Sequence, residues 1–319
     1  MLHNAPLNIN DCILETSAVR LSSYRNFFQV NNNDAYSIYK WNEEISSRMM
    51  KLIAVIEIIL RNRIHSTMSD YMKGTANGGP KSNDWFNHIS LRQGAINKIK
   101  NAMTDNRGRL IRPTPSANFV ISNMTYGFWP NILKAENDIK NKGIPWGSLF
   151  KSIFPGLPTQ SAGYWSKLKK REPIISRCFS VGELRNRIAH FEPIWKFGDE
   201  LEEVFERRGV TPKIITPAPT NKKEAIQRLA NEFNKALELL SWLSPNSHQD
   251  YINSENKKSI EWLISEKAMD SFINHTEMTK ISFNRAIKAR KIKGMALSGQ
   301  GCSIITIKKN NAGLLFLYP

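Results

Sequence analysis

Arg185, Asn186 and His190 are the residues of this chain whose types and spacing are best suited to chemistry. Histidine titrates closer to neutral pH than other side chains, so it suits proton transfer. Arginine donates forked, permanently charged hydrogen bonds to phosphate oxygens. Attack of the 2′-hydroxyl of RNA on its own phosphodiester needs both kinds of group and requires no metal ion. The three residues therefore predict cleavage of RNA without a metal or another cofactor.

A short helix is expected to position these residues. Residues 180–183, Ser-Val-Gly-Glu, fit a capping box and predict the first turn of that helix. Pro193 predicts its end, because the residue before a proline avoids the helical region. Asn186 and His190 are four residues apart and share a face. Arg185 lies about 140° from His190 at about 100° per residue. We therefore expect a second subunit or a frayed last turn to complete the site.

The spacing alone leaves a second interpretation open. His190 could cap the last carbonyls of its helix, and the neighbouring arginines could form ordinary surface salt bridges. Arg187 is expected to point away from the apolar face of the motif helix. It could therefore contact a phosphate or remain a solvated charge, and the sequence favours the two interpretations equally.

Glu57 lies in the apolar stripe of a predicted helix. A half-buried carboxylate needs a partner. Arg61, one turn later, is the favoured partner. The alternative is that Glu57 orients Arg185 or Arg187 at the predicted site.

Further candidates for RNA contact are basic or aromatic. Lys167, Lys169, Lys170 and Arg171 precede the motif helix by about ten residues, and predict a phosphate-binding edge of the same groove or a solvated face. The central tryptophans predict core packing, with base stacking as the alternative. These are Trp129, Trp146, Trp165 and Trp195.

The composition favours a polyanionic partner. The 319 residues carry a formal net charge of +17, and phosphate neutralisation by Lys and Arg makes nucleic acid the leading candidate. The three cysteines lie far apart, which predicts no metal site and no disulfide framework and fits a reducing cytoplasm. We see no signal-peptide pattern and no apolar run long enough for a bilayer. We therefore expect a cytoplasmic protein without a membrane partner.

Apolar periodicity predicts an all-α fold. The expected helices cover residues 8–29, 34–45, 47–72, 119–141, 160–177, 222–243 and 255–275. Gly127 and Pro130 predict a break in the fourth of these, and Pro173 predicts the end of the fifth. Asn83 is expected to cap a further helix that carries Trp85 and Ile96.

The chain is predicted to change character after Leu243. Ser244–Ser247 predicts a linker between a helical domain, 1–243, and a basic C-terminal α+β segment, 244–319, of unknown role. Residues 282–293 suggest a basic helix that would bind nucleic acid or an acidic antitoxin, or would only be a solvated helix. Residues 301–307 and 314–318 predict a terminal β-hairpin.

The stretch Leu184–Ile194 resembles the signature of the Abi-like proteins, which are bacterial abortive-infection proteins of the HEPN superfamily. Tyr36–Met68 and Met124–Trp129 resemble two further stretches of that family. The superfamily's ribonuclease motif is an arginine, a polar residue and, after a short spacer, a histidine. Arg185, Asn186 and His190 match this motif. The resemblance spans roughly residues 10–243.

The resemblance implies a HEPN-type helical bundle with extra helices, a homodimer with a composite active site, and metal-independent endoribonuclease activity. It assigns phosphate binding to Arg185, orientation of the site to Asn186 and proton transfer to His190. RNA ends with 2′,3′-cyclic phosphates are the expected products, and an antiphage effector or toxin, restrained by an antitoxin or inhibitor, is the expected role.

Two other functions stay open. One is a non-catalytic RNA-binding or regulatory module on the same scaffold. The other is a helical interaction protein whose charge recruits an acidic partner.

Overall fold

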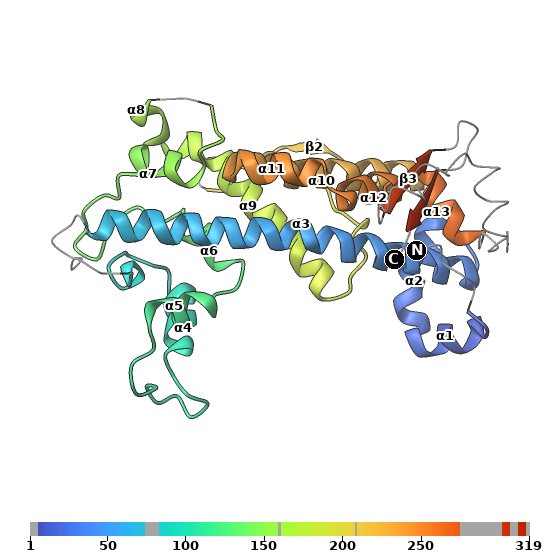
Figure 1. Ribbon diagram of the computed structural model, residues 1–319, viewed down its shortest axis with the longest axis horizontal. Helices are drawn as coiled ribbons and strands as arrows, with labels where there is room; N and C mark the ends of the chain where they lie inside the picture. Colours follow the sequence, from blue (N-terminus) through green and yellow to red (C-terminus); the bar gives the residue numbers. More distant parts are fainter. Residues whose placement is uncertain are drawn as a thin grey trace.

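One long helix, α3 (Asn32–Lys73), organises the fold in the computed structural model (Figure 1). The structure describes residues 6–73, 83–158, 161–207 and 209–274, with the backbone of two C-terminal strands. At about 1.5 Å per residue, the 42 residues of α3 extend over roughly 60 Å. Apolar side chains recur every three or four residues, so one face of α3 is continuously buried. Among them are Ile45, Met49, Leu52, Ile56, Leu60 and Ile64.

Most other helices pack along α3. The N-terminal pair is α1 (Ile9–Thr16) and α2 (Ala18–Phe28). Another group is α10 (Lys222–Leu243), α11 (Pro245–Ile252), α12 (Glu255–Leu263) and α13 (Glu266–Ile273). Helix α9 (Leu168–Ala189) crosses α3 and contacts α10 (Figure 1). Two short helices, α7 (Trp146–Ile153) and α8 (Ala162–Trp165), link α3 to α9.

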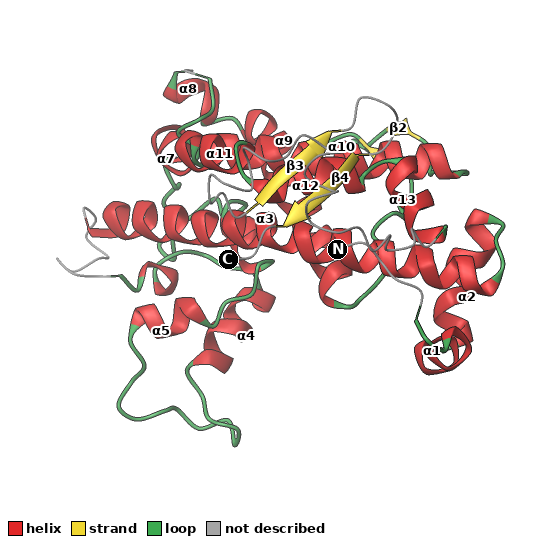
Figure 2. Cartoon of the chain, turned by 45° about the vertical axis from the view of Figure 1, so that its right-hand side comes forward, coloured by secondary structure: helices red, strands yellow, loops and turns green. Residues whose placement is uncertain are grey.

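A lobe of short elements lies on the side of α3 away from α10 and α12 (Figures 1 and 2). It contains the 3₁₀ turn η1 (Trp85–Asn87), α4 (Gln93–Ala102), α5 (Ala117–Ser122) and α6 (Phe128–Ile132). The indole of Trp85 donates a hydrogen bond to Nδ1 of His65 on α3 at 3.0 Å. His65 therefore helps to anchor the lobe. The central tryptophans are also core residues, at most 4% exposed: Trp129, Trp146, Trp165 and Trp195.

The all-α prediction is confirmed, with differences at element boundaries. Helix α10 occupies the predicted residues 222–243. Residues 34–45 and 47–72 belong to one helix, because no glycine or proline interrupts α3. The predicted break at Gly127 separates α5 from α6, but the helical prediction for 119–141 is too long, since both helices are short and α6 ends at Ile132. Asn83 caps no helix, because a single 3₁₀ turn follows it.

The predicted linker at Ser244–Ser247 is also wrong. Ser244 ends α10, and its hydroxyl oxygen accepts the N–H of Ser247 at 3.2 Å, which caps α11. Helices α12 and α13, which follow α11, pack on α3. The indole of Trp41 on α3 donates a hydrogen bond to the carbonyl of Leu263 at 2.8 Å. Residues 245–273 are therefore part of the helical core rather than of a separate segment.

Two small antiparallel hairpins complete the described chain. The predicted C-terminal hairpin is confirmed as β3 (Cys302–Thr306) and β4 (Ala312–Phe316), with Cys302 opposite Phe316. The second hairpin, β1 (Glu200–Leu201) with β2 (Ile214–Thr216), was not predicted. The predicted basic helix at 282–293 lies outside the described residues. Among the described helices, none combines the length and apolar character needed to span a bilayer.

Candidate active site at the end of helix α9

The motif lies at the C-terminal end of α9, which is one continuous helix. The prediction of a separate helix that begins at Ser180 is therefore wrong. Pro173 does not stop α9, because at the sixth position it removes a single backbone hydrogen bond, the one to the carbonyl of Lys169. Ser180 lies inside the helix, and its hydroxyl donates to Oε2 of Glu232 at 3.3 Å instead of capping a first turn.

Helix α9 ends in a tight turn at His190. Phe191 follows with φ of 55°, in the left-handed region, and its N–H donates to the carbonyl of Ile188 at 3.1 Å. The N–H of Glu192 donates to the carbonyl of Arg187 at 2.8 Å. These two bonds satisfy carbonyls that a helix end leaves free. The helix thus stops before Pro193, and its last turn presents His190 to solvent.

The segment after this turn is held firmly against α3. Asn42, a buried residue of α3, accepts the N–H of Ile194 through Oδ1 at 2.9 Å. Arg187 donates to the carbonyl of Lys196 at 2.6 Å, so it stabilises this loop. The fully buried ring of Trp195 packs against Tyr24, Phe27 and Phe28. Asn42 was not predicted as part of the site, and the interpretations considered for Arg187 did not include this structural role.

Arg185 lies beside Glu57. Its Nε is 3.9 Å from Oε2 of Glu57, and its side chain is 33% exposed. This Nε has no hydrogen-bond partner in the described part of the chain, and Nη1 reaches Oδ1 of Asn186 only at 3.5 Å. Of the three partners considered for Glu57, which are Arg61, Arg185 and Arg187, the structure places Arg185 within ion-pair distance. Arg61 instead donates to the side chain of Asn62.

His190 and Asn186 are both exposed at the end of α9. The backbone N–H of His190 donates to the carbonyl of Asn186 at 3.0 Å, while its imidazole makes no hydrogen bond within the described ranges. The structure therefore brings Arg185 and Asn186 together, and leaves the imidazole open to a ligand. Among the described residues, no group of three or more His, Cys, Asp or Glu side chains is arranged to hold a metal ion.

The predicted basic edge does not border this site. Lys167, Lys169 and Lys170 lie at the opposite end of α9, roughly 30 Å from His190 at about 1.5 Å per residue. Arg171 is 4% exposed and donates to the carbonyl of Leu133 at 3.4 Å. Its burial lowers the pKa of the guanidinium to about 10. The prediction of Arg171 as an RNA contact is therefore wrong.

Tyr126 joins the lobe to α9 one turn before Arg185. Its ring lies so close to Gly182 that a Cβ there would approach it to 2.8 Å. Burial raises the pKa of the Tyr126 hydroxyl well above its usual value, and the nearby Cys178 and Glu57 raise it further. Gly182 is thus the point where the lobe packs directly on α9.

A groove of about 410 Å³ lies next to the motif, between α3 and the end of α9. Its wall combines aromatic and aliphatic side chains with a few polar ones, including Tyr39, Asn42, Met50, Ile188 and Phe191. The side chain of Phe191 is 68% exposed. An exposed apolar surface beside His190 suits either a nucleobase or another protein chain.

The family model of the Abi-like proteins matches residues 12–196, which is more than half of the chain. The chain belongs to the Abi-like protein family. No curated protein and no solved structure matches it. The match runs from within α1 to the loop that Arg187 stabilises. It therefore includes the three motif residues Arg185, Asn186 and His190.

Membership in the Abi-like family suggests a role in abortive infection. The predicted family is thereby confirmed, whereas the wider HEPN assignment stays a prediction. Helices α10–α13 follow the matched region, although α10, α12 and α13 pack on α3.

Proposed function

We propose that this Abi-like protein is a metal-independent endoribonuclease of the HEPN type that acts in abortive infection as an effector or toxin. The observation that best supports this is the state of Arg185. One carboxylate lies 3.9 Å from its buried Nε, which has no hydrogen bond within the described residues, and a third of the side chain is exposed. A guanidinium carries five N–H donors, so Arg185 retains the capacity to bind a phosphate while Glu57 limits its orientation.

The chemistry follows from the two charged groups. His190 accepts the proton of a 2′-hydroxyl, whose oxygen attacks the adjacent phosphorus. The bond from phosphorus to the 5′-oxygen breaks, which leaves a 2′,3′-cyclic phosphate. Arg185 stabilises the negative charge that develops on the phosphate oxygens, and Asn186 orients the strand beside it. A protonated imidazole or water supplies the proton that the leaving oxygen takes.

We propose a homodimer as the active form. Arg185 and His190 lie on different faces of the last turns, and no hydrogen bond or ion pair joins them within the described ranges. A second copy would supply a histidine to each arginine if the two helix ends met across a two-fold axis. The exposed Phe191 and the groove beside it provide an apolar surface at this end of α9.

A cleavage assay with a chelator present tests the proposal. His190→Ala should lower the rate of RNA cutting by roughly two to four powers of ten, the usual contribution of general acid–base catalysis. His248→Ala on α11 is the matched control and should cut like the wild type. Both variants should unfold at the wild-type temperature.

Two results would contradict this assignment. Cutting by His190→Ala at the wild-type rate would exclude the imidazole as the proton-transfer group. Tight binding of diverse RNAs by the wild type without any cutting would support the non-catalytic alternative.

A further inference from the structure

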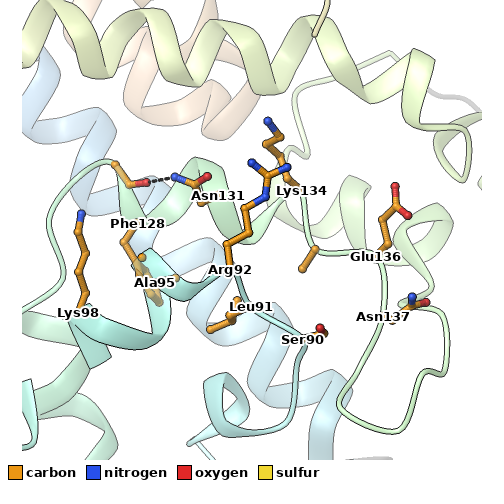
Figure 3. Close-up of a pocket in the computed structure, with 13 residues that line it drawn as sticks. Ser90, Leu91, Arg92, Ala95, Lys98, Phe128, Asn131, Lys134, Glu136 and Asn137 are labelled. Atoms are coloured by element: carbon orange, nitrogen blue, oxygen red, sulfur yellow. Dashed lines mark hydrogen bonds between the residues drawn. The ribbon is translucent and has the colours of Figure 1, made fainter. Parts of the chain in front are cut away.

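A second cationic site lies in the lobe, away from the motif. A cavity of about 690 Å³ opens between α4, α6 and the loop after α6. Three cationic side chains line it, Arg92, Lys98 and Lys134. Figure 3 shows the charged ends of Arg92 and Lys134 close together, with Lys98 on the other side of the cavity. None of the three forms an ion pair within the described part of the chain.

Within the described residues, the charge in this cavity is only partly balanced. Lys134 lies over two rings, with Nζ 4.1 Å from the centre of Phe205 and 5.4 Å from that of Phe179. Burial lowers the pKa of Lys134 and the neighbouring Arg92 lowers it further, and together they outweigh Glu172, which raises it. Two cations at interacting distance repel each other unless an anion lies between them.

The acidic groups nearby do not fill this role. Glu136 lines the cavity but is exposed and forms no ion pair in the described ranges. Glu172 is fully buried and is bonded to Arg207. The cavity therefore keeps an excess of positive charge.

We propose that this cavity binds a backbone phosphate of the RNA substrate, as a subsite remote from the scissile bond. The proposal rests on the proposed function for the identity of the strand. Arg92 and Lys134 supply the charged donors to the phosphate, and Lys98 a third, because only one of its hydrogen bonds is used by Oγ1 of Thr125, at 2.8 Å.

The position of the cavity along α9 favours RNA over a small free anion. Phe179, Gly182 and Asn186 are spaced three and four residues apart, so they form one stripe on α9. Lys134 lies against the first of them and Tyr126 against the second. The third is the polar residue of the motif. From Phe179 to His190 the helix rises roughly 16 Å, at about 1.5 Å per residue. A stacked strand rises about 3.4 Å per nucleotide. About five nucleotides would therefore cover the rise from Phe179, which Lys134 contacts, to His190.

The test measures RNA binding to the full chain carrying His190→Ala, so that the probe is not consumed. In this background Arg92→Gln with Lys134→Gln removes two charges from the cavity. Arg107→Gln with Lys140→Gln is the matched control, because both residues are exposed, lie in the same lobe and do not line the cavity. Affinity for a single-stranded RNA of about fifteen nucleotides is measured as a function of salt concentration.

The cavity variant should bind this RNA at least tenfold more weakly than the control variant at moderate salt. The slope of log affinity against log salt should fall by about 0.7, since the cavity neutralises one phosphate and each phosphate neutralised on a single strand contributes about 0.7 to the slope. A three-nucleotide RNA, too short to reach the cavity, should bind both variants equally. Circular dichroism verifies that both variants are folded.

Equal affinities of the two double variants for the long RNA would overturn the proposal, as would a wild-type chain that binds no RNA. Inorganic phosphate and AMP form a separate arm. If either one binds in the cavity while RNA affinity stays at the control value, the cavity is a small-anion site and the proposal fails. A wild-type chain that binds through the cavity but never cuts would reject the proposed function and leave the subsite in place.

Discussion

Arg177 and Arg185 lie about two turns apart on α9 but have different surroundings. The side chain of Arg177 is 10% exposed and pairs with two carboxylates, those of Glu203 and Glu238. Arg185 is 33% exposed and has one carboxylate, Glu57, at 3.9 Å. The protein thus uses the hydrogen-bonding capacity of Arg177, whereas it leaves part of the capacity of Arg185 unused. The difference indicates which arginine serves the fold and which is available to a ligand.

The elements that pack on each part of α9 explain the difference. The carboxylates around Arg177 come from α10, which packs on α9, and from the loop between β1 and β2. The end of α9 faces α3, and its last turn is open to solvent. Glu57 is the acidic residue of α3 that reaches Arg185, so it orients the guanidinium without saturating it.

The largest expected effect on folding comes from Arg177→Ala. Its removal leaves two carboxylates without a partner, so we expect a loss of about 3–5 kcal/mol in the free energy of unfolding. Denaturant titration measures this loss. Below its unfolding temperature the variant should still cut RNA within a few-fold of the wild type. If Arg177→Ala leaves the denaturation midpoint unchanged, Arg177 does not stabilise the fold, and the proposed difference between Arg177 and Arg185 is wrong.

Arg185→Ala should have the reverse pattern. We expect the rate of cutting to fall by about two to three powers of ten, the typical cost of one donor to a developing negative charge. The free energy of unfolding should change by less than about 1 kcal/mol, because a partly exposed ion pair contributes little. Single-turnover kinetics and thermal unfolding check both. A large loss of stability with normal cutting would assign Arg185 to the fold.

Glu57→Gln should have an intermediate effect, because it removes the charge that orients Arg185 and keeps the shape. We expect kcat to fall about tenfold, or about 1.4 kcal/mol in the barrier, with little change in KM. Glu44→Gln is the control, since it breaks an ion pair with Arg48 on the same helix. If both variants cut alike, Glu57 does not position Arg185.

The smallest expected effect is on stability in acid and concerns Glu200, in β1. Burial raises its pKa, but ion pairs with Lys235 and Arg228 outweigh this and lower the pKa below the ordinary 4.5. A carboxyl group with a lowered folded-state pKa stabilises the fold above pH 4.5, and this contribution is lost as the pH falls through the folded-state value. Thermal unfolding of Glu200→Gln should therefore depend less on pH below 4.5 than that of the wild type. Parallel pH profiles would refute this linkage.

The motif was predictable because its residues are local. Arg185, Asn186 and His190 lie within six positions, and the all-α fold follows from apolar spacing in α3 and α10. The extent of α9 was harder to predict. Pro173 predicted a break, but α9 continues through it because Pro173 lies near the start of the helix and removes a single backbone hydrogen bond there. The pairing of Glu57 was misjudged for a related reason. The prediction favoured Arg61, which is close in sequence, over Arg185, which is 128 positions away in the chain but lies beside Glu57 in the fold.

Burial also separated residues that look alike in the sequence. Arg171 belongs to a basic run with Lys169 and Lys170, yet it packs inside against the ring of Trp146. The cationic cavity was missed because Arg92 and Lys134 come from different loops and meet only in the folded chain. Neither property follows from composition or periodicity, since both depend on tertiary contacts.

The most direct test of the account is the chemical nature of the RNA ends that the wild-type protein produces with a chelator present. Mass spectrometry of the fragments should show 2′,3′-cyclic phosphates on one side of each cut and 5′-hydroxyls on the other, because the 2′-oxygen is the nucleophile. Fragments with 3′-hydroxyl and 5′-phosphate ends would mean that water attacks the phosphorus. That result would contradict the roles assigned to His190 and Arg185.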